Sequence, residues 1–191
     1  MLKMNFWDDK WDLDVAVCPC DVHFNDWVEA QNITGKTIYH FGTGTHHIIG
    51  IRQAANGSGN KVFAITASKG EYDSYIDLVT ANAPVAKGYI AYFGDIYLTE
   101  PALLPEFDVV TMFHLHEFTK PNTGSADYGG LTDRALLDVM TGKLRPGGYM
   151  LFYMKSFAFD EAEQAIADWA KGGAVERVGE FKTLLVYRKR A

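Results

Sequence analysis

The final two apolar stretches of the chain are so close together that they can only pair as a hairpin. Val175–Phe181 and Thr183–Tyr187 have the composition of strands, and they meet at Glu180–Lys182. Parallel neighbours need a connection of about a dozen residues or more, which this junction does not offer. The chain is therefore predicted to end in an antiparallel pair of strands.

Upstream of this hairpin, short apolar runs alternate with amphipathic stretches. Such alternation is typical of parallel strands joined by helices that cover the sheet. Five further strands are predicted, at Thr37–Phe41, Val62–Thr66, Tyr89–Phe93, Phe107–Met112 and Tyr149–Met154. We expect an α/β fold with a doubly wound, mostly parallel seven-stranded sheet, helices on both faces and the C-terminal antiparallel hairpin.

Four helices are predicted from apolar spacing and capping residues. Thr45, Thr132 and Asp160 are the predicted N-caps, and Asp160 with Glu163 has the spacing of a capping box. The helices are expected over about Thr45–Ala55, from near Glu71, over Thr132–Gly142, and from Asp160 to Gly172.

Composition limits the classes of function. At 191 residues and 48% hydrophobic content, the chain can bury one substantial core. Its formal net charge of −6 argues against nucleic acid as a partner, since phosphate binding needs clustered Lys and Arg. No apolar run approaches the roughly 20 residues of a membrane span, and no signal-peptide core is evident. We expect a cytoplasmic protein with a small-molecule substrate and neither a membrane nor a nucleic-acid partner.

The chain is predicted to consist of an N-terminal extension, residues 1–32, and a domain over residues 33–191. The extension is rich in acidic and aromatic side chains, including Trp7, Trp11, Phe24 and Trp27. These rings could close over a binding site as a lid. Equally, they could pack beneath the sheet or in the contact of a homodimer.

The segment Thr37–Gly50 reads as a buried strand, a turn with two glycines and the start of a helix. Gly42 and Gly44 let the backbone approach a ligand where a Cβ would block it. Thr45 would begin a helix whose free N–H groups favour an anionic group. The arrangement is typical of α/β proteins that bind nucleotide-like ligands.

Five segments in order resemble the class I S-adenosylmethionine-dependent methyltransferases. The most specific is Leu144–Leu151, with the sequence Leu-Arg-Pro-Gly-Gly-Tyr-Met-Leu. The others are Thr37–Gly44, Val62–Ser68, Tyr92–Ile96 and Phe107–Met112. A dinucleotide-binding dehydrogenase would need glycine at His47 and has no reason to end in a hairpin. The resemblance implies a Rossmann-like methyltransferase domain with S-adenosyl-L-methionine as cofactor.

The resemblance also implies where the cofactor binds. In this family the glycine turn approaches the methionine part, an acid ending the second strand holds the ribose hydroxyls, and an Asp after the third strand meets the adenine amine. Asp95 matches that last position. The full set of implied cofactor-binding residues is His40, Phe41, Gly42, Thr43, Gly44, Thr66, Ala67, Asp95, Ile96, Met112 and Phe113.

Three positions depart from the family pattern. His40 and Thr66 stand where the family usually has Asp or Glu, and His46 replaces the third glycine of the turn. The hydroxyls of Thr66 and Ser68 could recover part of the missing interaction, and Glu71 could reach back to the same place.

Histidines gather after the first and fourth predicted strands, which are neighbours in this fold. A histidine at this edge can act as a base, a proton shuttle or a metal ligand. Leu115-His116 resembles the Leu-His element that follows the fourth strand in many small-molecule methyltransferases, so His116 is the predicted catalytic base. Proximity alone can also suffice for methyl transfer. The five histidines are His40, His46, His47, His114 and His116.

We predict no metal ligands. Cys18 and Cys20 are separated only by Pro19, a spacing that disfavours an intrachain disulfide. With His23 they offer soft ligands, but in a single cluster without the second cluster that a zinc site of this kind needs.

The segment Glu117–Gly130 is long and polar for a strand-to-helix connection, so it is expected to contact substrate, with Asp127 and Tyr128 as its likeliest functional side chains on chemical grounds. No Asn/Asp-Pro-Pro-Tyr/Phe element follows the fourth strand, which disfavours amino-group methylation of nucleic acid bases.

These observations favour an S-adenosylmethionine-dependent methyltransferase that acts on a small molecule. The alternative is a non-catalytic or altered-ligand protein that keeps the methyltransferase fold with a degraded cofactor site, which His40 and Thr66 motivate. A third interpretation is a metal-dependent enzyme built on the histidine cluster.

Overall fold

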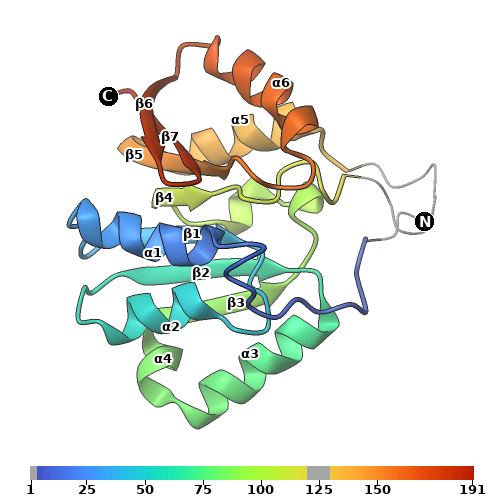
Figure 1. Ribbon diagram of the computed structural model, residues 1–191, viewed down its shortest axis with the longest axis vertical. Coiled ribbons are helices and arrows are strands. Elements are labelled where there is room, and N and C mark those ends of the chain that lie inside the picture. The colour runs from blue at the N-terminus through green and yellow to red at the C-terminus, as the bar shows by residue number, and fades with distance from the viewer. Residues whose placement is uncertain (1–3, 120–129) are drawn as a thin grey trace.

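The computed structural model describes residues 4–119 and 130–191, and its centre is a mixed seven-stranded sheet (Figure 1). Five strands run parallel, β7 pairs antiparallel with β5, and β6 pairs antiparallel with β7, which confirms the predicted hairpin. In spatial order the strands are β3 (Tyr89–Phe93), β2 (Lys61–Thr66), β1 (Thr37–Phe41), β4 (Phe107–Thr111), β5 (Leu144–Tyr153), β7 (Leu184–Lys189) and β6 (Val175–Phe181).

Consecutive residues of the central strands enter two different hydrophobic clusters, because successive strand side chains point to opposite faces. Ile38 of β1 belongs to one cluster and Tyr39 to the other. The Ile38 cluster includes residues of α1 and α2, whereas the Tyr39 cluster includes residues of α5 and α6. The helices are α1 (Cys20–Ala30), α2 (Ile48–Ala55), α3 (Lys69–Ala81), α4 (Ala83–Gly88), α5 (Asp133–Lys143) and α6 (Phe159–Ala170), with short 3-10 turns η1 (Ile96–Leu98) and η2 (Pro101–Leu103).

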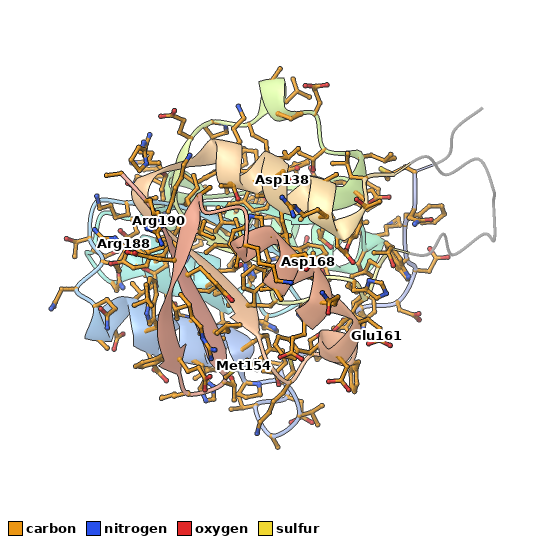
Figure 2. The ribbon with its side chains drawn as sticks, turned by 90° about the horizontal axis from the view of Figure 1, so that it is seen from above. Asp138, Met154, Glu161, Asp168, Arg188 and Arg190 are labelled. Atoms are coloured by element: carbon orange, nitrogen blue, oxygen red, sulfur yellow. The ribbon has the colours of Figure 1, made fainter. Side chains whose placement is uncertain are left out.

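The outward surfaces of the last two helices are charged. Asp138 of α5 and Asp168 of α6 are both exposed, as the view from above shows (Figure 2). Arg134 joins the two helices, since it pairs with Asp138 and also donates to the carbonyl oxygen of Asp168 at 2.9 Å. Among the described residues, no helix combines the length and the hydropathy needed to cross a membrane.

Two predicted helix starts are wrong. Helix α2 begins at Ile48, because the N–H of Thr45 bonds the carbonyl oxygen of Trp11 and its hydroxyl bonds Asp12. Helix α6 begins at Phe159, after a turn in which the N–H of Phe159 bonds the carbonyl oxygen of Ser156. Asp160 therefore lies in the first turn and is not the cap. Its negative charge there interacts favourably with the helix dipole. The predicted cap at Thr132 is confirmed.

Two segments form more regular structure than predicted. The Leu-Arg-Pro-Gly-Gly segment lies inside β5, which pairs with β4 through an irregular register between Phe107 and Val109. The second half of the N-terminal extension is helix α1, whose Phe24 and Trp27 are buried against the sheet. The spacing of Cys20, Phe24, Trp27 and Val28 is that of one helix face, so the sequence did contain this signal.

His47 fixes the connection between β1 and α2. It adopts a left-handed backbone with φ of 46° and is 2% exposed. Its Nδ1 lies 2.8 Å from the hydroxyl of Tyr89, and its Nε2 lies 3.0 Å from the carbonyl oxygen of Glu71. A neutral ring satisfies both contacts, with Nε2–H donating to the carbonyl and Nδ1 accepting from the hydroxyl. Burial lowers the pKa of His47 to about 4.

We predict that His47 makes the fold acid-sensitive. Between the ordinary histidine pKa of 6.5 and about 4, the unfolded chain binds a proton that the folded chain does not. The free energy of unfolding should therefore fall as the pH falls through this window, by at most about 1.4 kcal/mol per pH unit from this group. Urea unfolding from pH 7.5 to pH 4.5 measures the slope.

The variant His47→Gln keeps a neutral donor and acceptor but cannot titrate. We expect it to be less stable than the parent at pH 7.5 and to lose less stability on acidification. Equal slopes for the two proteins would contradict this role for His47.

Candidate functional site

A cavity of about 740 Å³ opens at the edge where the parallel strands end. Such a volume is within the usual range of small-molecule sites, about 300–1,000 Å³. Its walls come from the N-terminal segment and from the residues that follow β1, β2, β3, β4 and β5. The lining consists of Trp7, Trp11–Asp14, Val17, Cys18, Cys20, Asp21, Phe41, Gly42, Gly44, His46, Thr66–Ser68, Glu71, Gly94–Ile96, His114, Glu117, Phe118, Tyr153 and Lys155–Ala158.

The turn after β1 needs its two glycines. Gly42 and Gly44 have φ of 83° and 55°, in the left-handed region that side chains disfavour. A Cβ on Gly44 would lie 2.3 Å from Nε2 of His46. The ring of His46 therefore lies against the turn, and its Nδ1 accepts the N–H of Ile48 at 3.2 Å, which caps α2 in place of Thr45.

Glu71 brings a carboxylate to the end of β2. It lies in the first turn of α3, where Ser68 is the N-cap and accepts its N–H. Its Oε2 accepts hydrogen bonds from Thr66 at 2.6 Å and from Thr43 at 3.0 Å. Burial raises the pKa of Glu71, while the hydroxyl of Thr66 and then that of Thr43 oppose the shift. The carboxylate of Glu71, on the following helix, thus lies beside Thr66, as the sequence analysis considered.

Asp21 brings a second carboxylate, to the end of β1. Its Oδ2 lies 3.8 Å from Nε2 of His40 and 3.7 Å from Nε2 of His46. Burial raises the pKa of Asp21 to about 7. The residue belongs to α1, outside every segment that carries the family resemblance, and sequence reasoning missed it.

His40 faces inward at the end of β1. Its Nδ1 lies 2.9 Å from the hydroxyl of Thr111 on β4, so it joins two neighbouring strands. Its Nε2 is buried, and the described residues give it no hydrogen-bond partner. Desolvation lowers the pKa of His40 well below its ordinary value, so the ring is neutral at pH 7.

Asp95 follows β3 and is nearly buried. Its Oδ1 accepts the N–H of Tyr97 at 3.0 Å, which caps η1, and its Oδ2 accepts the N–H of Asn5 at 3.2 Å. The carboxylate of Asp95 thus ties the N-terminal segment to the turn that follows β3.

The N-terminal segment runs along the cavity and is tied to its edge by main-chain bonds. The N–H of Trp7 bonds the carbonyl oxygen of Ala67, and the carbonyl oxygen of Trp7 accepts from Lys69. The ring centroid of Trp7 lies 4.8 Å from that of Phe118, and that of Trp11 lies 6.0 Å from it. Within the extension, residues 5–14 thus border the cavity and α1 packs on the sheet.

His114 is held by a chain of polar groups. Its Nδ1 lies 3.1 Å from Oε2 of Glu117, and Oε1 of Glu117 accepts the hydroxyl of Ser156 at 2.5 Å. Burial lowers the pKa of His114, but the Glu117 carboxylate outweighs it and raises the value to about 9. Nearby, the Sγ atoms of Cys18 and Cys20 lie 3.4 Å apart as free thiols.

His116 lies outside the cavity lining. Its Nδ1 lies 2.5 Å from Oδ2 of Asp133, and its N–H donates to the hydroxyl of Tyr97. The chain turns immediately after β4, with φ of 74° at His116, so His114 and His116 do not share a strand face. The catalytic role of His116 stays a prediction without support from its position.

The cavity brings together seven of the predicted cofactor-binding residues. These are Phe41, Gly42, Gly44, Thr66, Ala67, Asp95 and Ile96. The other four lie behind this surface, and Thr43 among them acts on it through Glu71. They are His40, Thr43, Met112 and Phe113. Asp127 and Tyr128, the expected substrate contacts, lie outside the described residues.

Carboxyl groups dominate the charge of the cavity wall. Six carboxyl side chains line it, against two cationic groups, Lys155 and His114, whose pKa the Glu117 carboxylate raises to about 9. This balance favours a cationic or zwitterionic ligand and disfavours one that carries phosphates. The six are Asp12, Asp14, Asp21, Glu71, Asp95 and Glu117, and the lysine is Lys155.

No protein-family description matches the sequence, and no curated protein matches it either. Solved structures do resemble the fold. The N-methyltransferase NodS from Bradyrhizobium japonicum has a TM-score of 0.60 at 13% identity, over 90% of this chain and 96% of that chain. NodS is also known in complex with S-adenosyl-L-homocysteine.

Two further structures span nearly the whole chain. A SAM-dependent methyltransferase from Aquifex aeolicus has a TM-score of 0.58 at 15% identity, over 94% of this chain and 100% of its own. The [4+2]-cyclase SpnF has a TM-score of 0.62 at 13% identity, over 100% of this chain and 88% of its own. At these identities the likeness shows the fold, and it is the fold of the class I S-adenosylmethionine-dependent methyltransferases.

Proposed function

We propose that this protein is an S-adenosylmethionine-dependent methyltransferase with a small-molecule acceptor. The observation that carries the proposal is the carboxylate of Glu71, which two hydroxyls hold at the end of β2. We infer that it takes the role of the acid that the family resemblance implies at the end of the second strand, where this chain has Thr66.

The cavity residues fit the cofactor in shape and in charge. Gly42 and Gly44 line the cavity and would lie beside the methionine part, Glu71 would hold the ribose hydroxyls, and Asp95 would accept the adenine amine. The excess of carboxyl groups suits a ligand with a sulfonium cation. When bound, S-adenosylmethionine supplies an electrophilic methyl group.

The residues after β4 and β5 are assigned to the acceptor. His114, Lys155 and Ser156 line the cavity there and are polar groups that the assigned cofactor contacts do not use. Their task is to hold the acceptor atom beside the methyl group, because methyl transfer needs position and alignment more than proton transfer. His114 is better placed for this than His116, which bonds Asp133 outside the lining.

The walls of the cavity favour a small acceptor. The segment that carries Trp7 and Trp11 is bonded across the edge of the cavity, which limits access for a macromolecule. The formal charge of −6 and the acidic lining disfavour a polyanionic acceptor.

We predict that Glu71→Gln weakens cofactor binding. A hydrogen bond to a charged group contributes about 1.5–3 kcal/mol, so the loss should be roughly ten- to a hundredfold in Kd. Isothermal titration with S-adenosyl-L-homocysteine measures it. The control is Asp73→Asn, which removes an exposed carboxylate from the same helix and should leave Kd unchanged.

The variant Thr66→Asp tests the role of Glu71 in a second way. It would place a carboxylate against that of Glu71, so we expect weaker binding and not recovery of a family-like acid. Tighter binding by Thr66→Asp, or no detectable binding by the parent at millimolar ligand, would contradict the proposed role of Glu71.

The acceptor class is predicted to be a metabolite. Protein incubated with methyl-labelled S-adenosylmethionine and a cell extract should transfer label to the acid-soluble, low-molecular-mass fraction. Label in precipitated RNA or protein would contradict this acceptor class. Cofactor binding without transfer to any fraction would favour the alternative of a non-catalytic protein.

We predict that the N-terminal segment slows ligand release. Trp7→Ala removes the ring that packs on Phe118 while leaving the main-chain pairing with Ala67 and Lys69 possible. The dissociation rate of S-adenosyl-L-homocysteine, measured by stopped flow, should rise several-fold. Trp169→Phe, a change in the core around Phe152 and Tyr187, should leave the rate unchanged, and equal rates for all three proteins would count against a lid.

A further inference from the structure

Two thiols and an imidazole meet on the cavity wall. Cys18, Cys20 and His114 each offer one ligand atom, and these atoms lie within 4.8 Å of one another. Cys18 precedes α1, Cys20 is its first residue and the histidine follows β4, so folding brings together groups that are about a hundred residues apart in sequence. The contacts assigned to the cofactor use none of the three.

The spacing of the sulfurs suits a tetrahedral ion. Two thiolates bound to zinc at about 2.3 Å are about 3.8 Å apart. The Sγ atoms of Cys18 and Cys20 are 3.4 Å apart, so a shift of a few tenths of an ångström would accommodate the ion. A set of two sulfurs and one imidazole nitrogen is a soft ligand set, of the kind that zinc and other thiophilic ions prefer.

The histidine already has the support that a metal ligand needs. Metal-binding imidazoles usually donate their second ring nitrogen to a carboxylate, which fixes the ring and its tautomer. Nδ1 of His114 is paired with Glu117 at 3.1 Å, and Ser156 holds the other oxygen of that carboxylate. This leaves Nε2 as the nitrogen available to an ion.

We propose that Cys18, Cys20 and His114 form a binding site for zinc or a similar thiophilic divalent cation, with the fourth coordination position supplied from the cavity. Three protein ligands with one open position are the pattern of reactive zinc sites, whereas structural sites have four protein ligands. All three residues line the cavity, so its ligands have access to that position. If the chain is a methyltransferase as proposed, the open position would hold a donor atom of the acceptor, and that extension alone rests on the proposed function.

This site differs from the cluster of Cys18, Cys20 and His23 that the sequence suggested. Along the chain the nearest imidazole to the two cysteines is His23, and the resulting group looked incomplete. In the structure His23 points elsewhere, with Nδ1 2.8 Å from the hydroxyl of Thr183. His114 takes its place, and no local spacing pattern could have indicated it.

The test is a metal titration of the full-length protein, freed of any affinity tag and stripped with a chelator. Co²⁺ is added first and Zn²⁺ is then used to displace it. We expect one equivalent of Co²⁺ to bind with thiolate-to-cobalt charge-transfer bands and with visible bands of tetrahedral coordination. Cys18→Ser and Cys20→Ser should lose the charge-transfer intensity, and His114→Gln should bind at least tenfold more weakly.

Two further variants separate a built site from a chance meeting of thiols. Glu117→Gln, which touches no ion, should weaken binding by roughly ten- to a hundredfold through the ring of His114. His23→Gln is the matched control and should bind like the parent. Circular dichroism of each variant checks that it is folded.

Three results would overturn the proposal: no stoichiometric binding by the folded parent at micromolar Co²⁺, a bound-cobalt spectrum without thiolate bands, or loss of binding in His23→Gln with retention in His114→Gln. Titration with S-adenosyl-L-homocysteine is run on the same samples. Metal binding without cofactor binding would support the metal site and contradict the proposed function. Cofactor binding without metal binding would support the proposed function and contradict the metal site.

Discussion

The hydrogen bonds that Glu71 accepts from Thr43 and Thr66 hold the cavity edge of this protein together. They join the turn after β1, the end of β2 and the first turn of α3 through one nearly buried carboxylate. A buried carboxylate without such partners would be costly, so the two hydroxyls and the helix start are required for the acid to lie there. His47 reinforces the same junction, because its Nε2 meets the carbonyl oxygen of Glu71.

The N-terminal segment is the second constraint on the site. It occupies the N–H group of Thr45 that would otherwise begin a helix, and it pairs with the chain between Ala67 and Lys69. It also contributes a large part of the cavity wall, from Trp7 to Asp21. The cavity is therefore built by the sheet edge and by the segment from Trp7 to Asp21 together.

The sequence indicated the fold well because the fold depends on patterns that are local. Apolar runs such as Phe107–Thr111 and the short junction before β7 specify strands and a hairpin without reference to distant residues. The predicted cap at Thr45 failed because a distant segment, through Trp11 and Asp12, satisfies the groups that a cap would use. Local rules describe an isolated helix start, and this one is not isolated.

The site was less predictable than the fold for the same reason. Gly42, Gly44 and Asp95 lie at positions that the family pattern marks, and the cavity includes all three. Asp21 and the pairing of His114 with the thiols depend on where α1 packs, which periodicity does not reveal. The choice of His116 rested on a neighbour in sequence, Leu115, whereas the turn after β4 directs His116 to Asp133 and His114 to the cavity.

Two acids of the cavity, Asp21 and Glu71, belong to helices, whereas the family pattern has acids at strand ends. Different contacts therefore fix their positions. An acid at a strand end is fixed by the pairing of the sheet, but the position of Asp21 depends on the packing of α1 through Phe24 and Trp27. His40 makes the exchange possible, because a buried neutral imidazole can bond Thr111 on one side and face the carboxyl group of Asp21 on the other. A strand-end carboxylate at residue 40 would instead confront Asp21 with a like charge in a nearly dry environment. The histidine at the end of β1 and the acid on α1 are thus one arrangement, and it makes the N-terminal helix part of the cavity wall.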